Sequence, residues 1–157
     1  MSGIRLDLAF LLNQTAYAFS ARLGTALRGI GVNVREFCVL MKAAEEERTQ
    51  NAVAELAGLD KTTMVSTLDR LEKAGLAERR VSASDRRARV VAVTAKGRKV
   101  LERAYAVYDE VIDQVLGVLE PDARDGFIDA LQVLTTSSCA SPSHTAPQRR
   151  KLPAAAR

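Results

Sequence analysis

The chain has 157 residues, of which 47% are hydrophobic and 27% are charged, a composition typical of one globular domain with an extension. No stretch of about 18 uncharged apolar residues occurs, and the first apolar stretch carries Arg5 and Asp7, so we expect neither a transmembrane helix nor a secretory signal. Two cysteines and one histidine argue against a disulfide framework, a metal centre and a histidine-based active site. These features favour a cytoplasmic protein without a cofactor.

The first third of the chain predicts helices. Apolar residues recur at three- and four-residue steps, which indicates a helix over residues 5–30. Asn33, followed three residues later by Glu36, resembles a capping box that opens a second helix. Thr49 is suited to cap a third helix over residues 50–57.

A fourth helix is predicted between Asp60, a suitable N-cap, and Gly75, a suitable C-terminal stop. Together with the preceding helix and the turn at Gly58 it forms a helix-turn-helix candidate. Small side chains on its outward face would allow close approach to base edges, and hydroxyl groups can pair with bases or phosphates. The candidate DNA-contacting residues of this helix are Lys61, Thr62, Thr63, Val65, Ser66 and Arg70.

An arginine-rich hairpin follows directly, with strands predicted over residues 77–81 and 89–93. Arginine suits the narrow, strongly negative minor groove, so Arg86 and Arg87 are candidate DNA contacts at the tip, and Asp85 is placed to hold the Arg87 guanidinium in a bidentate pair. The predicted fold is mainly α with a small two- to three-stranded antiparallel β wing, a winged helix-turn-helix. The hairpin arginines are Arg79, Arg80, Arg86, Arg87 and Arg89.

Positive charge is concentrated in this part of the chain. Residues 61–99 contain 11 Lys/Arg and 4 Asp/Glu, a balance of +7, whereas the remaining residues contain 12 and 15, a balance of −3. Such a local patch is the electrostatic footprint of a polyanionic partner. A winged helix that binds protein is the alternative, and the low aromatic content of 4% argues against it.

Thr94 is suited to cap a fifth helix, whose apolar stripe extends to Leu119. A helix of this size would be roughly 37 Å long, more than so small a domain can bury alone, which suggests a partner helix. Pro121 suits the first position of a sixth helix. Serine, proline, alanine and arginine are frequent in residues 137–157, which we expect to be a disordered basic tail.

Three sequence stretches between residues 33 and 101 follow one another in a distinctive order: VREFCVLMKAAEE, TQNAVAELAGLDKTTMVSTLDRLEKAGLAERR and SDRRARVVAVTAKGRKVL. They resemble the MarR family of bacterial transcription regulators, named for multiple antibiotic resistance. The resemblance implies a homodimer whose recognition helices enter successive major grooves of a pseudo-palindromic double-stranded DNA operator, with half-sites about 34–36 Å apart. It also places the family's wing Asp-x-Arg on Asp85 and Arg87 and favours a repressor. The sequence offers no nucleophile–base pair, so we do not expect an enzyme.

The resemblance implies a single domain over residues 1–136. Residues 33–97 would form the winged helix-turn-helix, and residues 5–30 and 95–136 the dimerisation helices. Many relatives bind a small aromatic or acidic effector between the dimerisation helices and the DNA-binding lobe. In this chain six residues could line such a site, and for each of them packing in the core or in an interface is the alternative role. The six candidates are Asn13, Tyr17, Phe37, Met41, Tyr105 and Tyr108.

A redox-responsive regulator that uses Cys38 or Cys139 is the remaining alternative. The organic-hydroperoxide sensors of the family carry a reactive cysteine in the first helix, and the similar run LLNQTAYAF of this chain has Ala16 at that place. Cys38 lies between apolar residues, which predicts a buried and inert thiol.

Overall fold

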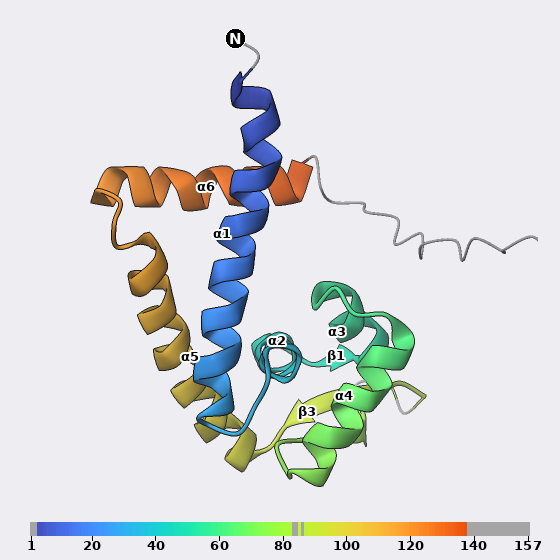
Figure 1. Cartoon of the computed structure of the whole chain (residues 1–157). Coiled ribbons are helices and arrows are strands. Elements are labelled where there is room, and N and C mark those ends of the chain that lie inside the picture. The colour runs from blue at the N-terminus through green and yellow to red at the C-terminus, as the bar shows by residue number, and fades with distance from the viewer. Residues whose placement is uncertain (1–2, 83–84, 86, 138–157) are drawn as a thin grey trace, which may run out of the picture. The chain divides into compact units, whose positions relative to one another are not determined.

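The computed structural model describes residues 3–82, 85 and 87–137 (Figure 1). The chain forms two compact units, Met1–Leu116 and Gly117–Arg157, and the described residues of the second include helix α6 (Pro121–Ser137). Mainly helical structure with a small antiparallel sheet confirms the predicted fold class. The elements of the first unit are α1 (Gly3–Arg28), α2 (Val34–Glu45), β1 (Arg48–Thr49), α3 (Gln50–Leu56), α4 (Lys61–Lys73), β2 (Ala77–Val81), β3 (Arg89–Val93) and α5 (Ala95–Leu116).

The helix boundaries follow the predicted caps. Asn33 and Glu36 form the complete capping box, in which the Asn33 side chain accepts from the Glu36 N–H at 3.0 Å and the Glu36 side chain accepts from the Asn33 N–H at 2.8 Å. Asp60 Oδ1 accepts from two backbone N–H groups at the start of α4, at 2.9 and 3.0 Å. Gly75 adopts a φ of +71° in the turn after α4, a conformation that glycine takes without steric cost.

The prediction for α5 was too long at its C-terminal end. The helix ends at Leu116, three residues before Leu119. Gly117 follows directly, and glycine is about 1 kcal/mol less favourable than alanine inside a helix. The next apolar residue, Val118, is 85% exposed, so no burial of that side chain within the unit compensates for this cost.

The sheet has the strand order β1-β3-β2 with both pairs antiparallel. Strand β3 lies in the centre, where Val91 pairs with Arg79 of β2 on one side and with Arg48 of β1 on the other. Strand β1 has two residues, too few for a hydrophobic alternation to be recognised in the sequence. The predicted two- to three-stranded wing is therefore a three-stranded sheet.

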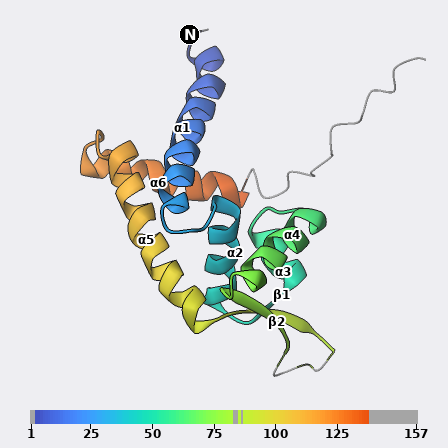
Figure 2. The same ribbon diagram turned by 60° about the horizontal axis from the view of Figure 1, so that its bottom comes forward.

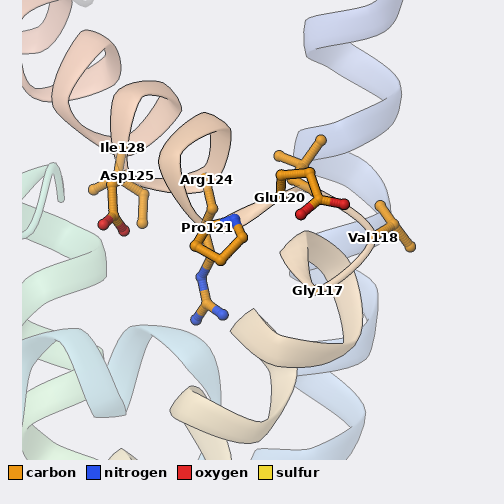
Figure 3. Close-up of a pocket in the computed structure, with 8 residues that line it drawn as sticks. Gly117, Val118, Glu120, Pro121, Arg124, Asp125 and Ile128 are labelled. Atoms are coloured by element: carbon orange, nitrogen blue, oxygen red, sulfur yellow. The ribbon is translucent and has the colours of Figure 1, made fainter.

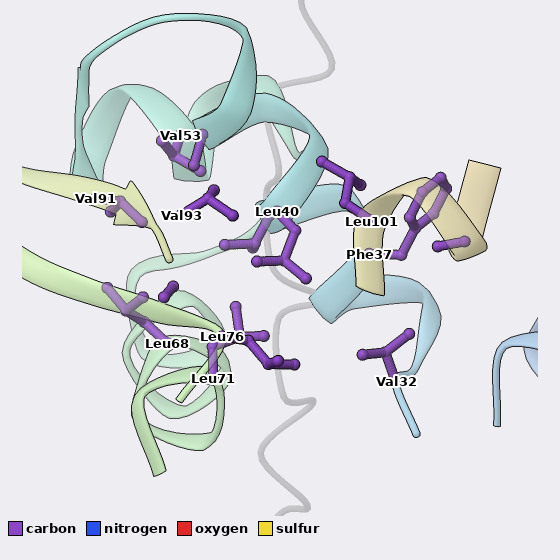
Figure 4. Packing of buried hydrophobic residues seen from close by; sticks show 14 of the residues in the cluster. Val32, Phe37, Leu40, Val53, Leu68, Leu71, Leu76, Val91, Val93 and Leu101 are labelled. Carbon is purple, nitrogen blue, oxygen red and sulfur yellow. The ribbon is translucent and has the colours of Figure 1, made fainter. Parts of the chain in front are cut away.

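One hydrophobic core joins the helices and the sheet of the first unit. Figure 4 shows Phe37 and Leu40 of α2 among side chains from α4, α5 and the sheet. The C-terminal half of α1 contributes Leu23 and Leu27, which are buried. Its N-terminal half instead exposes large apolar side chains: Leu8, Phe10, Leu11 and Leu12.

The start of α5 is closely joined to the turn that ends α4. Thr94 Oγ1 donates to the Gly75 carbonyl oxygen at 2.7 Å and accepts from the Gly97 N–H at 2.9 Å. A β-carbon on Gly97 would overlap the Leu76 carbonyl oxygen and lie 2.8 Å from a Val93 methyl carbon. Glycine is thus required at residue 97 for the close approach of backbone to backbone.

Candidate nucleic-acid interface

The outward face of α4 carries small side chains. Met64 and Leu68 point into the core and are fully buried, whereas Thr62, Val65 and Ser66 are exposed. The largest of these three, Val65, is 38% exposed. This division matches the helical spacing predicted from the sequence and leaves a face that can approach base edges closely.

The hydroxyl groups near the start of α4 have different hydrogen-bond partners. Thr63 Oγ1 donates to Asp60 Oδ2 at 2.5 Å and so takes part in the N-cap. This bond, ahead of the backbone N–H bonds, lowers the pKa of the Asp60 carboxyl group. Ser66 Oγ donates to the Thr63 carbonyl oxygen at 3.0 Å and keeps its lone pairs for an outside donor.

Arg79 links the hairpin to α4. Its place in the hairpin suggested an arginine that faces outward, but its side chain contacts residues of α3 and α4 instead. Its guanidinium pairs with Asp69 at 2.8 Å, forms an ion pair with Glu72, and donates to Gln50 Oε1 at 3.1 Å. The Arg79 N–H also donates to Glu72 Oε1 at 2.7 Å. Arg79 therefore neutralises two carboxylates of α4 that would repel phosphates, a contact over ten residues that sequence spacing does not reveal.

Arg70 lies on the same helix and forms an ion pair with Glu36 of α2. The distance from Arg70 Nε to Glu36 Oε1 is 3.0 Å, and the Arg70 side chain is 68% exposed. Lys61 at the start of α4 is exposed as well. Both cations are DNA-contact candidates predicted from the sequence, whereas the contact between Arg70 and Glu36 joins residues far apart in the chain and was not predicted.

The wing carries exposed cations on β2, at the tip and on β3. Figure 2 shows the β2–β3 hairpin extending away from the helices, and Arg80, Arg87 and Arg89 are exposed. Asp85 Oδ1 accepts from the Arg87 backbone N–H at 2.9 Å and forms no ion pair with its guanidinium among the residues described. A two-residue separation suits such an Asx turn, which corrects the predicted bidentate pair. Arg86 lies outside the described residues.

The root of the wing is tied to the segment before β1. The Ser82 side chain is buried and hydrogen-bonded to the Glu47 carboxylate, and the Ser82 N–H donates to the Ala88 carbonyl oxygen at 2.9 Å. The wing is therefore held at its base by Ser82 and along β2 by Arg79.

Three comparisons place these features among known proteins. Residues 30–88 match the model of the MarR family. The chain is 35% identical over 83 residues to the transcriptional regulator HosA of Escherichia coli O157:H7, a match that covers 53% of this chain and 62% of HosA. CouR of Rhodococcus jostii RHA1 bound to p-coumaroyl-CoA has a TM-score of 0.78 at 28% identity, covering 88% of this chain and 98% of CouR.

A structure of the transcriptional repressor CouR bound to a 23-mer DNA duplex has a TM-score of 0.76 at 26% identity, over 86% of this chain and 96% of that one. Over residues 30–88 the chain resembles the MarR family, and its fold matches solved structures of MarR-family regulators. The match to HosA spans less than two thirds of the length of that relative. HosA and CouR are transcriptional regulators.

Three of the candidate effector residues lie together. The ring centroids of Phe37 and Tyr105 are 5.8 Å apart in an edge-on arrangement, and those of Phe37 and Tyr108 are 5.7 Å apart. Phe19 of α1 contacts Tyr108 edge-on at 5.8 Å. Phe37 is 2% exposed and belongs to the core, whereas Tyr105 is 40% exposed. Burial raises the pKa of Tyr108, with smaller contributions from Cys38 and Asp109.

The remaining effector candidates are more scattered. Met41 is half-buried against the core, and Asn13 and Tyr17 are exposed on α1, Tyr17 to 72%. An open cavity of about 620 Å³ in the second unit, shown in Figure 3, is lined by residues 117–121, 124, 125 and 128 and includes none of the effector candidates.

Cys38 is half-buried on α2, and burial raises the pKa of its thiol, partly offset by the charge of Lys42. A raised pKa disfavours the reactive thiolate. Cys139 lies outside the described residues, as does the predicted basic tail after Ser137.

In the part of the chain that the structure describes, no helix is long and apolar enough to span a bilayer.

Proposed function

We propose that this chain is a dimeric, sequence-specific DNA-binding repressor of transcription that acts in the cytoplasm and is released from DNA by a small aromatic or acidic effector. One observation carries the proposal: an exposed helix face of small side chains lies beside a hairpin with exposed arginines. The DNA-bound structure of its relative CouR supports it.

In this proposal α4 enters the major groove. Thr62 and Ser66 pair with base edges, and the Val65 methyl groups contact a thymine methyl. Ser66 is suited to accept from a base amino group, because its own proton is bonded to the Thr63 carbonyl oxygen. The brace from Arg79 to Asp69 removes a repulsive charge from this face.

The wing contacts the adjacent minor groove through Arg87, and Arg86 is proposed to accompany it. Asp85 fixes the backbone that presents Arg87. Lys61 and Arg70 flank the helix and would bind phosphates, which gives affinity and register rather than sequence preference.

The apolar N-terminal half of α1 is the proposed dimer surface within the first unit. Phe10 and Leu11 are 61% and 57% exposed, and the neighbouring Leu8 and Leu12 extend the same apolar region. A single protomer leaves this area in water, whereas a two-fold partner with the same surface would bury it. Recognition helices of such a dimer would meet half-sites about 34–36 Å apart.

The effector is proposed to bind beside the aromatic cluster of α1, α2 and α5. Tyr105 is partly exposed next to the buried Phe37, so an aromatic ligand could stack there and shift α2. The complex of CouR with p-coumaroyl-CoA, which carries an aromatic group and acidic phosphates, supports this class of ligand.

Selection of bound duplexes from a random DNA pool tests the proposal. We expect enrichment of pseudo-palindromes with half-sites one helical turn apart, and loss of binding when an aromatic acid or an aromatic CoA thioester of the correct structure is added. A pool that stays random after repeated rounds would contradict the function, and a protein-binding winged helix would then be favoured.

A further inference from the structure

Glu36 is a buried carboxylate whose charge the helix cap does not explain. Its side chain is 7% exposed, and one oxygen accepts from the Asn33 N–H at 2.8 Å while the other lies 3.0 Å from Arg70 Nε. A glutamine serves as well as a glutamate at this position of a capping box. Burying a charge is costly unless it is paired, and beside the favourable dipole at the start of α2 the ion pair with Arg70 is the contact that compensates the Glu36 charge.

Arg70 uses the Nε edge of its guanidinium for this contact. The side chain is otherwise 68% exposed, on α4 near Ser66 of the base-reading face. A long arginine side chain in water loses considerable rotamer freedom when it binds a phosphate. A guanidinium already held at one edge loses less, and its two outer nitrogen atoms form the planar fork that phosphate oxygens accept.

We propose that Glu36 is a positioning residue for DNA binding: from α2 it holds the Arg70 guanidinium of α4 so that the outer edge of that group meets a backbone phosphate. The inference rests on the proposed function and adds to it a residue that touches no DNA. It also makes α2 the link between the proposed effector site and α4.

The neighbour of Glu36 in the chain explains that second role. Phe37 packs between Tyr105 and Tyr108 of α5, at centroid distances of 5.8 and 5.7 Å. A ligand that displaces Phe37 therefore moves the first turn of α2, and with it the carboxylate that orients Arg70. The coupling needs no contact between the ligand and DNA.

The variant Glu36→Gln distinguishes loss of positioning from loss of charge, because the first should weaken DNA binding and the second should strengthen it. Glutamine keeps the bond to the Asn33 N–H, so α2 and the thermal unfolding temperature should be preserved. Loss of a negative charge near DNA would by itself strengthen binding. Loss of the contact that orients Arg70 should weaken binding to the selected duplex about five- to tenfold, as measured by fluorescence anisotropy.

Glu55→Gln on α3 is the matched control, since it removes an exposed carboxylate of the same winged helix without touching Arg70. It should bind equally or more tightly. Arg70→Lys, which keeps the charge but lacks the Nε edge, should weaken binding as much as Glu36→Gln. The double variant should be no weaker than either single variant, because both changes remove one contact.

The outcomes distinguish the positioning role of Glu36 from the proposed DNA-binding function. Binding of Glu36→Gln that is as tight as that of the wild type, while the wild type binds the selected duplex, would overturn the role of Glu36 and leave the DNA-binding function standing. A wild-type protein that binds no duplex would overturn both. In the free protein the Arg70 Nε–H resonance should be protected from exchange, and Glu36→Gln should abolish that protection.

Discussion

The N-terminal half of α1 and the outward face of α4 are both exposed helical surfaces, yet their chemistry is opposite. The first exposes Phe10 and Leu11 to more than half of their area, whereas Thr62 and Ser66 of the second are small and polar. Large apolar side chains gain free energy by leaving water, and small polar ones can exchange water for base edges. The contrast fits the two partners proposed above, a second copy of the chain and DNA.

Both surfaces depend on the same core. Leu27 of α1 and Met64 of α4 are each fully buried in it, on the helices that carry the two surfaces. Substitutions on either surface do not touch these buried residues, so a change on one surface should leave the other folded. The contrast between the two surfaces can therefore be tested by mutation.

The largest effect is expected on the apolar surface. Leu11→Asp combined with Leu12→Asp should give a monomer in sedimentation experiments, because charges would enter an apolar interface. Affinity for the selected duplex should fall by a factor of about 100 or more, since two linked recognition helices bind far more tightly than one. Leu56→Asp on α3, 51% exposed, should remain dimeric. A double variant that stays dimeric would place the interface elsewhere.

Arg87→Glu should give the next largest effect, on DNA alone. It removes a groove contact and adds repulsion, so affinity should fall about 30- to 100-fold while the dimer persists. Arg103→Glu, the same change at an exposed residue of α5, is the control and should change affinity far less. Equal losses in both variants would show that net charge, not the wing, determines binding.

Gly97→Ala tests the close contact between the start of α5 and the turn that ends α4. The added methyl group meets backbone atoms, so the free energy of unfolding should fall by about 2 kcal/mol in chemical denaturation. Gly126→Ala in α6 has open space around its β-carbon and should be neutral or stabilising by about 0.5 kcal/mol. Similar changes in the free energy of unfolding for both variants would contradict close packing at residue 97.

Thr62→Ala and Ser66→Ala should alter base preference more than affinity. Each loses about 1 kcal/mol against the preferred base, so repeated selection should return a changed base at one position of each half-site. An unchanged consensus would indicate that these hydroxyl groups face phosphates or water.

The smallest effect concerns pH. The hydrogen bond from Thr63 lowers the pKa of Asp60 in the folded state, so the cap stabilises α4 above the unfolded pKa and the benefit is lost as pH falls through the folded pKa. Asp60→Asn caps without titrating, so its unfolding temperature should decline less than that of the wild type between about pH 4 and pH 2. Parallel curves for the two proteins would contradict this assignment.

The sequence was informative where a local rule operates. Asn33 with Glu36, Asp60 and Gly75 placed the helix ends, and the spacing of Met64 and Thr67 separated the two faces of α4. It was uninformative for contacts between distant residues. Arg79 reads as a wing arginine until Asp69 and Glu72 are seen beside it, and the pair of Glu36 with Arg70 joins two helices that no periodicity relates. The effector site depends on such long-range packing, so it remains a proposal.

The absence of a side chain at residue 97 has a consequence for how a movement of α5 would reach α4. Because α5 begins against the turn that ends α4 with no space for a methyl group, we expect a tilt of α5 to be transmitted to α4 and not absorbed in a loop. A helix of 22 residues is about 33 Å long, so a tilt of about 5° moves its far end by roughly 3 Å. In the proposed dimer, a movement of this size would be close to the roughly 3.4 Å rise between successive base pairs.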